Sequence, residues 1–166
     1  MNRISKENYY LNIAQTVLER ATCLRRVYGA IIVKNDEIIS TGYNGSPRGR
    51  KNCVDMGFCT REAMQVPRGE RYELCRSVHA EMNAIISAAR SECIGGTIYL
   101  AGRDVATGEL IPDLLPCPMC RRMIINAGLS KIVIRRTPST YDILNVQDWV
   151  FHDDSVIDPS ESGEQA

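Results

Sequence analysis

The sequence predicts a single α/β domain, in which layers of helices flank a mixed β-sheet. The chain has 166 residues and 44% of them are hydrophobic, which suits one compact domain with a real core. The predicted elements run helix, strand, strand, helix, strand, helix, strand. A short turn joins the first two strands and favours antiparallel pairing, whereas helices separate the later strands and favour parallel pairing.

The N-terminal half begins with an amphipathic helix predicted over residues 6–24, where apolar residues recur at helical spacing after the capping residue Ser5. Two β-rich runs follow at 29–33 and 37–43, separated by a hairpin turn. Residues 46–77 lack clear periodicity. An aperiodic stretch of that length is uncommon in a compact domain unless it is functional or held in place by a bound group. Its three cysteines indicate that a metal ion holds it.

In the C-terminal half, helical spacing returns over 78–91 and a strand is predicted at 97–100. A further helix is predicted over 116–127, with proline at its start and Gly128 after its end, and a strand at 131–135. The pattern over 141–151 is ambiguous. Residues 153–166 are acidic and poor in large apolar side chains, so we expect a loose tail after a domain that spans 1–152.

Charge and cysteine content exclude several classes of protein. Lys and Arg together number 20, as do Asp and Glu, and a zero balance argues against a dedicated nucleic-acid binder. No apolar run approaches the roughly 20 residues of a membrane span, and the first eight residues lack the apolar core of a signal peptide. We therefore expect a cytoplasmic protein that binds neither nucleic acid nor membrane. In that reducing compartment, an odd set of seven cysteines points to metal binding or catalysis.

Two short motifs carry the chemistry, each at the predicted start of a helix. They are His79-Ala80-Glu81 and Pro116-Cys117-Pro118-Met119-Cys120. Catalytic zinc commonly has three protein ligands and an open fourth position for water, and His79, Cys117 and Cys120 can supply those three. The C-x-x-C spacing places two thiols at one helix N-terminus, where the helix dipole favours thiolates.

Glu81 is the candidate catalytic residue. Residues two positions apart on a helix point about 200° apart, so Glu81 need not bind the metal that His79 binds, and it can act as a proton shuttle instead. The combination H-x-E with P-C-x-x-C is the zinc deaminase signature. Two alternatives stay open: a purely structural zinc knuckle with Glu81 in solvent, and a thioredoxin-like Cys117/Cys120 pair, which leaves His79 and Glu81 unexplained.

The sequence resembles the cytidine deaminase superfamily, and within it the deoxycytidylate (dCMP) deaminases. The run Thr41-Gly42-Tyr43-Asn44-Gly45-Ser46-Pro47 narrows the superfamily to that family, and similar motifs cover most of residues 10–142. The resemblance implies a three-layer fold with a five-stranded mixed sheet, often a hexamer, and regulation by dCTP with Mg²⁺ as activator and dTTP as inhibitor. It implies hydrolysis of dCMP to dUMP and ammonia, which supplies dUMP for thymidylate synthesis, with Glu81 moving the protons.

The resemblance also implies contacts to the substrate. Asn44 would face the sugar hydroxyl, the backbone of Ala80 and Pro116 would touch the edge of the base, and Tyr141 would lie near the substrate. A nucleotide also needs a cation for its 5′-phosphate. Arg90 is the candidate, because eleven residues after His79 it would share that residue's helical face. Three basic residues of the 46–77 segment are further candidates: Arg48, Arg50 and Lys51.

Four further cysteines are candidates for a second, structural zinc. Cys23 and Cys53 resemble positions that some family members use for such a site, and Cys59 and Cys75 would complete a closed four-thiolate site. The alternative is four free or buried thiols. Cys93 has no place in this scheme.

Two other functions stay open at this point. The chain could deaminate a different substrate, such as a nucleoside, a free base or a tRNA. It could also be a zinc-stabilised, competence-associated protein without turnover, although a structural zinc site has no need of Glu81.

Overall fold

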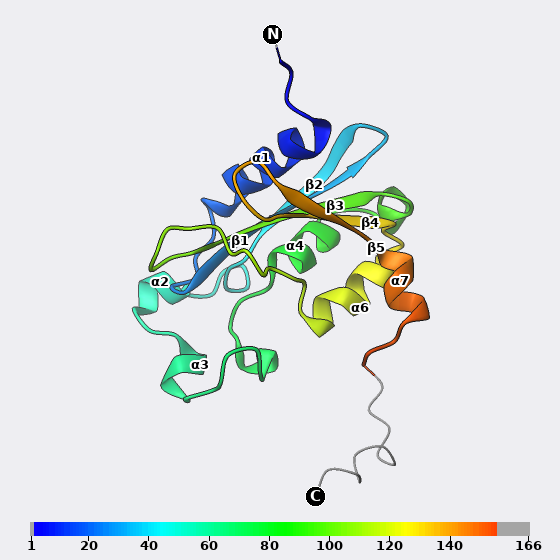
Figure 1. Ribbon diagram of the computed structural model, residues 1–166. Helices are drawn as coiled ribbons and strands as arrows, with labels where there is room; N and C mark the ends of the chain where they lie inside the picture. Colours follow the sequence, from blue (N-terminus) through cyan, green and yellow to red (C-terminus); the bar gives the residue numbers. More distant parts are fainter. Residues whose placement is uncertain (1, 156–166) are drawn as a thin grey trace, which may run out of the picture.

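The computed structural model describes residues 2–155. Its core is a five-stranded sheet in the order β2-β1-β3-β4-β5 (Figure 1). Pairing is antiparallel between β1 and β2, β1 and β3, and β4 and β5, and parallel between β3 and β4. The sheet is therefore mixed, as the sequence predicts. The strand bounds are β1 Arg26–Lys34, β2 Glu37–Tyr43, β3 Thr97–Asp104, β4 Lys131–Arg135 and β5 Tyr141–Asn145.

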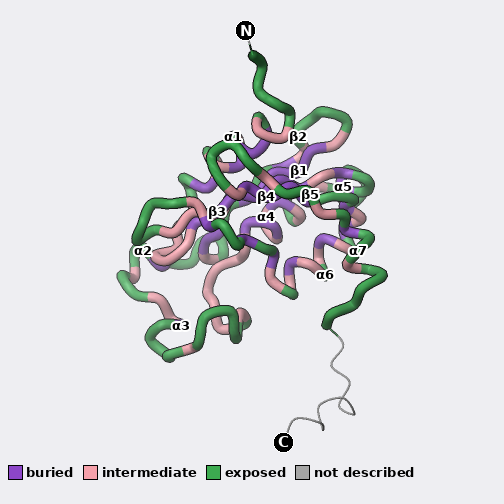
Figure 2. Tube along the Cα trace, viewed as in Figure 1, coloured by how far each residue is buried: buried purple, intermediate pink, exposed green. Residues whose placement is uncertain are grey.

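Helices cover both faces of the sheet, which makes three layers (Figure 1). On one face lies α1 (Lys6–Leu18), whose apolar stripe packs on alternate residues of β1, β3 and β4. The opposite face carries α4 (Ala80–Ile86), α5 (Arg90–Cys93), α6 (Pro118–Ala127) and α7 (Val146–Phe151). Figure 2 shows the buried residues gathered along the central strands and on the helix faces that meet them. The predicted three-layer architecture is confirmed.

The segment 46–77 leaves and rejoins the domain at one point. Gly45 and Val78 exchange two backbone hydrogen bonds, of 3.2 and 2.8 Å, which close the excursion at its base. The segment contains two four-residue helices, α2 (Cys53–Met56) and α3 (Thr60–Ala63), and the 3₁₀ turn η1 (Tyr72–Leu74). Figure 2 shows that most of it is exposed or half-buried.

Two helix predictions are wrong in their extent. The helix predicted over 6–24 ends at Leu18, and four residues later the Thr22 N–H donates to the carbonyl of Asn44 instead of continuing the helical ladder. The helix predicted over 78–91 is two helices. The first ends at Ile86, and the second begins at Arg90. The Glu92 carboxylate accepts a hydrogen bond from the Ala89 N–H and so caps the start of the second helix.

The C-terminal tail predicted at 153–166 lies mostly outside the described residues, and the three that are described, 153–155, are exposed. Within residues 2–155, no helix combines the length and the apolar character needed to cross a membrane.

Candidate metal centre and the cavity beside it

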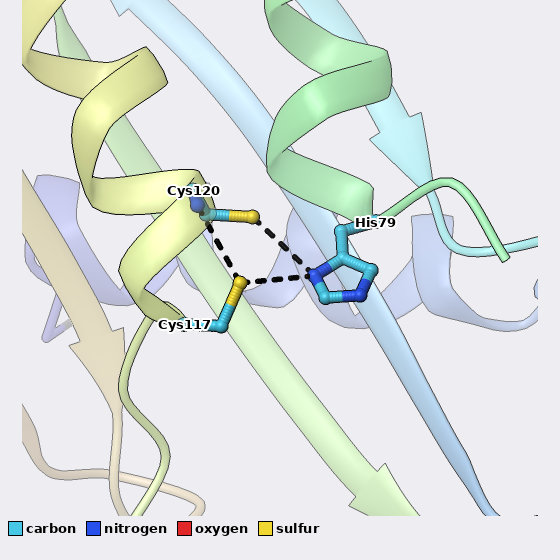
Figure 3. Close-up of side chains that lie close together, drawn as sticks. All are labelled: His79, Cys117 and Cys120. Atoms are coloured by element: carbon cyan, nitrogen blue, oxygen red, sulfur yellow. Dashed lines mark hydrogen bonds between the residues drawn. The ribbon is translucent and has the colours of Figure 1, made fainter. Parts of the chain in front are cut away.

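Two helix starts on the same face of the sheet bring three metal-binding side chains together (Figure 3). His79 is the N-cap of α4, and Cys117 is the N-cap of α6, with Cys120 one turn further on. The Nδ1 atom of His79 lies 3.4 Å from the Sγ of Cys117 and 3.4 Å from the Sγ of Cys120. The backbone N–H of Cys120 donates to the Cys117 sulfur at 3.4 Å, which fixes the Cys117 side chain at the helix start.

These distances fit a tetrahedral zinc ion. Zinc bonds of about 2.3 Å to sulfur and 2.0–2.1 Å to nitrogen, at tetrahedral angles, separate the two ligand atoms by about 3.5 Å. Both observed separations are close to that value. The donor set of one imidazole and two thiols is one that zinc uses in catalytic sites, with a fourth position open. In residues 2–155, this is the one group of three such side chains whose ligand atoms all lie within 4.8 Å of one another.

The three ligands influence one another's protonation. A hydrogen bond from the Cys120 thiol lowers the pKa of Cys117 to about 4, which burial opposes and His79 reinforces. The same bond, followed by burial, raises the pKa of Cys120. Burial disfavours the charged imidazole, but its interactions with Cys117 and Cys75 prevail and raise the pKa of His79 to about 10. A metal must displace the protons that remain, so its affinity increases with pH.

Glu81 is the buried carboxyl group beside these ligands. It lies in the first turn of α4, two residues after His79, and is only 6% exposed. Burial raises the pKa of Glu81, while the positive charge of the His79 imidazole opposes the shift. A carboxyl group with a raised pKa exchanges protons more readily near neutral pH than an exposed one, which is the property of a general acid–base catalyst.

His79, Cys117 and Glu81 all face one cavity. Its other walls come from the N-terminal end of β1, from the residue after β2, from the connection before α6, and from the 46–77 segment. Four arginines line it: Arg25, Arg26, Arg61 and Arg68. A metal-ligand set, a buried carboxyl and a group of cations thus share one pocket.

Asn44 lines the cavity but is also bound to the sheet. Its side-chain carbonyl accepts from the Tyr28 N–H at 2.8 Å, and its amide donates to the Arg26 carbonyl at 2.9 Å. The side chain therefore clamps the start of β1 to the end of β2. One amide hydrogen and one oxygen lone pair remain for another partner.

Ala80 and Pro116, two other residues predicted to contact the substrate, lie at the starts of α4 and α6, whereas Arg90 lies away from the metal centre. Ala80 is fully buried at the start of α4, and the carbonyl of Pro116 accepts from Arg121 Nε at 3.1 Å. Arg90 does not share the helix of His79, because that helix ends at Ile86. Arg90 borders a separate hollow between α5 and α6, and its Nε donates to the Asn126 carbonyl. The helical argument for Arg90 is therefore wrong.

Tyr141 also lies away from the metal centre. It packs with α1 on the opposite face of the sheet, and its hydroxyl donates to the Glu7 carboxylate at 3.4 Å. β5 is the edge strand next to β4, and its first residue presents this side chain toward α1. Within one copy of the chain, the expectation that Tyr141 lies near the substrate is wrong.

The four cysteines proposed for a second zinc do not converge to ligand distance. Cys23, Cys59 and Cys75 line the same cavity, and Cys53 is buried beside it. All seven cysteines are free thiols. Burial raises the pKa of Cys53. The neighbouring thiols of Cys23, Cys75 and Cys59 raise it further, which shows that they lie near Cys53.

Sequence reasoning missed the residues that the 46–77 segment contributes to the cavity. Tyr72 packs edge-on against His79, with ring centroids 5.7 Å apart, and the guanidinium of Arg61 lies 4.8 Å from the centre of the Tyr72 ring. A signal existed for Arg25 and Arg26, since they lie at the start of the first strand and therefore at the same end of the hairpin as Asn44. The aperiodic segment gave no comparable signal.

Comparisons with known proteins agree with this geometry. Residues 4–136 match the family model of the cytidine and deoxycytidylate deaminase zinc-binding region. A deoxycytidylate deaminase of Schizosaccharomyces pombe is 32% identical over 79% of this chain, and the match spans only 37% of that longer enzyme. A deoxycytidylate deaminase of Mycobacterium phage D29 is 33% identical over 80% of this chain and 96% of the phage protein.

A solved structure adds the fold. The dCMP deaminase of cyanophage S-TIM5, crystallised with dCMP and dUMP, is 25% identical, with a TM-score of 0.53 over 80% of this chain and 84% of that one. The family model covers far more than half of the chain and includes all three metal-ligand residues. The resemblance noted in the sequence is thereby confirmed, and the chain belongs to the cytidine and deoxycytidylate deaminase family.

Proposed function

We propose that this chain is a zinc-dependent deaminase that converts dCMP and water into dUMP and ammonia. The observation that carries the proposal is the buried Glu81 carboxyl beside the His79–Cys117–Cys120 set, at the wall of a cavity lined by arginines. A structural zinc site needs no buried carboxyl group next to it, whereas hydrolysis needs a group that moves protons. The names of the relatives support dCMP as the substrate.

Bound zinc would supply a Lewis acid at His79, Cys117 and Cys120 that lowers the pKa of water toward neutrality. Glu81 would move the protons. Its carboxylate takes a proton from the attacking water and delivers it to N3 of the ring as the oxygen bonds to C4. It then passes a second proton from that oxygen to the amine, and the bond between C4 and the amine nitrogen breaks to release ammonia. The raised pKa of Glu81 suits both directions of transfer.

We propose that the base and sugar contacts come from Asn44, Ala80 and Pro116. Asn44 lines the cavity and keeps one donor and one acceptor for a sugar hydroxyl. The backbone N–H of Ala80 and the carbonyl of Pro116 immediately precede Glu81 and Cys117 in the chain, so both flank the reacting groups. Residues 1–152 would form the deaminase domain, with 46–77 as an insertion.

A second zinc held by Cys23, Cys53, Cys59 and Cys75 remains a proposal. The position of the four thiols supports it, because Cys23, Cys59 and Cys75 line one cavity and all three raise the pKa of the buried Cys53 beside it. The test is the zinc content of Cys53→Ser beside that of Cys93→Ser, which alters another buried thiol outside the cluster. Loss of one of two zinc ions in Cys53→Ser alone supports the site. A wild-type content of one zinc per chain contradicts it.

The family resemblance also supports a regulated, oligomeric enzyme of the cytoplasm that supplies dUMP for thymidylate synthesis. We propose activation by dCTP with Mg²⁺, inhibition by dTTP, and a hexamer. Seven free thiols are consistent with a reducing compartment. Turnover with and without each triphosphate tests the regulation, and sedimentation tests the assembly.

The substrate assignment is tested by ammonia release from dCMP, deoxycytidine and cytosine, each with zinc-loaded protein. Rapid release from dCMP alone is the expected result. Release from deoxycytidine or cytosine but not dCMP would keep the deaminase chemistry and reject the nucleotide. No release from any of the three, with zinc bound, would favour a tRNA substrate or a protein without turnover.

A further inference from the structure

Arg61 differs from the other three arginines of the cavity in its burial. The residue is 8% exposed, although it lies on α3, in a segment that is otherwise largely exposed. The side chains of Arg25, Arg26 and Arg68 are 33%, 29% and 62% exposed. A guanidinium cannot lose its proton in a protein, so Arg61 keeps a full positive charge where water screens it poorly.

Arg61 also differs in what compensates its charge. Arg25 pairs with Glu62 at 2.8 Å, Arg68 with Asp113 at 3.7 Å and Arg26 with Asp104 at 3.9 Å. Among residues 2–155, no carboxylate comes within 4.0 Å of the Arg61 guanidinium. Its protein acceptors there are two backbone carbonyls, of Pro67 and Glu70, and both bind the same nitrogen, Nη2. Its Nε is buried without any partner in that part of the chain.

A buried guanidinium can be held by neutral oxygens, as Arg135 shows. Arg135 binds oxygens of Asn8 and Asn12 through both terminal nitrogens, between α1 and the sheet, although its Nε, like that of Arg61, is buried without a partner in residues 2–155, and it does not line the cavity beside the metal centre. In Arg61, one terminal nitrogen and Nε are left over, and the side chain lines the cavity that also contains Glu81. Arg61 therefore has a terminal nitrogen, Nη1, without a protein acceptor in residues 2–155, on a side chain that lines the cavity, whereas both terminal nitrogens of Arg135 are bound.

The position of Arg61 relative to the metal ligands is set by one aromatic ring. Tyr72 stacks beneath the Arg61 guanidinium at 4.8 Å and meets the ring of His79 at 5.7 Å. The two contacts hold the cation within the length of one nucleotide from the imidazole, and both groups line the same cavity. A phosphate attached to a sugar whose base reaches Glu81 would come within reach of this cation.

We propose that Arg61 binds the 5′-phosphate of the nucleotide and so selects a nucleotide over a nucleoside. Arginine suits this role, because its guanidinium charge attracts a phosphate and the N–H groups of Nη1 have no protein acceptor in residues 2–155. The inference rests on the proposed function for the identity of the base, but the phosphate contact depends only on Arg61 and the cavity. The insertion that sequence periodicity could not interpret thus provides the residue that determines specificity.

The test compares binding of dUMP with binding of deoxyuridine, two ligands that differ only in the phosphate and need no turnover. Calorimetry is run on the wild type, Arg61→Gln, Arg61→Lys and Arg71→Gln. Arg71 is the matched control, since it belongs to the same segment, is 60% exposed, pairs with Glu73 and lies outside the cavity lining. Thermal unfolding of each variant checks that it folds.

We expect Arg61→Gln to weaken dUMP binding by about 30-fold or more and to leave deoxyuridine binding within about twofold. Arg61→Lys, which keeps a positive charge but replaces the planar guanidinium by a compact ammonium group, should fall between Gln and wild type. Arg71→Gln should bind both ligands as the wild type does. Inorganic phosphate should compete with dUMP in the wild type and much less in Arg61→Gln.

Three results would overturn the inference: an equal loss of affinity for dUMP and deoxyuridine in Arg61→Gln, unchanged dUMP affinity in that variant, or no dUMP binding by the wild type. The first would show that Arg61 only supports the fold of the segment. Replacement of Arg26 that reproduces the selective loss, with Arg61→Gln unaffected, would move the role to Arg26. Failure of the proposed function is distinct, because it would appear as absent ammonia release from dCMP while dUMP binding still depended on Arg61.

Discussion

Gly42 of β2 lies directly against Ala80, the first residue of α4. A Cβ atom at Gly42 would fall 2.3 Å from the Ala80 carbonyl oxygen and 2.4 Å from the Ala84 backbone nitrogen. Only glycine lets the strand and helix approach this closely. That approach sets the position of α4, and with it the positions of His79 and Glu81 on either side of Ala80.

Gly42→Ala should therefore damage the site and the fold together. The backbone of Gly42 lies outside the left-handed region, so the cost comes from the collision with α4, on the order of 1–3 kcal/mol of unfolding free energy. Displacement of α4 should also reduce zinc content and turnover. The measurements are urea unfolding and metal analysis, with Thr41→Ala, on the exposed side of the same strand, as the control. Unchanged zinc and stability in Gly42→Ala would refute this account of how α4 is placed.

The metal centre predicts a different result for two equally buried cysteines. Cys120 and Cys93 are 0% and 1% exposed, but only Cys120 belongs to the ligand set. Cys120→Ser should lose catalytic zinc and all turnover. Cys93→Ser should keep zinc and turnover and lose about 1–3 kcal/mol of stability, because it buries a hydroxyl group in the core. Equal zinc contents in the two variants would be incompatible with the proposed ligands.

An ion pair between α1 and β3 gives a test of pH dependence. Arg103 donates two hydrogen bonds to Glu19, of 2.6 and 2.9 Å, and they lower the pKa of Glu19 below its usual 4.5. The pair therefore stabilises the fold above that value, and this contribution is lost as the pH falls through the lowered pKa. The Glu19 side chain is 57% exposed and that of Arg103 34%, so Glu19→Gln should cost no more than about 1 kcal/mol at pH 7.

The check is the difference in urea unfolding free energy between the wild type and Glu19→Gln, measured from pH 7 to pH 3. The difference should shrink as Glu19 becomes protonated in both the folded and unfolded chains. Glu109→Gln, whose carboxylate has no ion-pair partner in residues 2–155, should show no such trend. A difference that grows toward acid would have the wrong sign.

Four of the five strands could be predicted, because short-range signals and burial agree there, whereas β5 lies in the region 141–151 that the pattern left ambiguous. The strands at 37–43 and 131–135 have the bounds that the pattern predicts. The hairpin turn between β1 and β2 places Asn35 and Asp36 at positive φ, where these residue types are tolerated best. The buried apolar residues of β1, β3 and β4 are divided between the two helical layers, so the apolar pattern predicts these strands.

The helix ends could not be predicted, because tertiary contacts decide them. Apolar spacing continues in phase through 78–91, and neither glycine nor proline marks the break at Ser87. Glu92 instead caps a new helix at Ala89, which moves Arg90 away from His79. The two sequence motifs, at 79–81 and 116–120, identify the residues that the structure brings together at the metal centre, since each motif lies at the start of a helix. Arg61 and Tyr72 could not be identified, because their segment has no periodic pattern to place them.

The most direct test of the account is turnover of dCMP by Glu81→Gln, with zinc content and dUMP binding measured on the same sample. The amide keeps the shape of the side chain but can neither accept nor deliver the proton. The account predicts wild-type zinc, retained dUMP binding and turnover below about 1% of the wild type, the scale of a lost acid–base catalyst. Undiminished turnover in a zinc-loaded, folded Glu81→Gln protein would contradict the central role assigned to this carboxyl group.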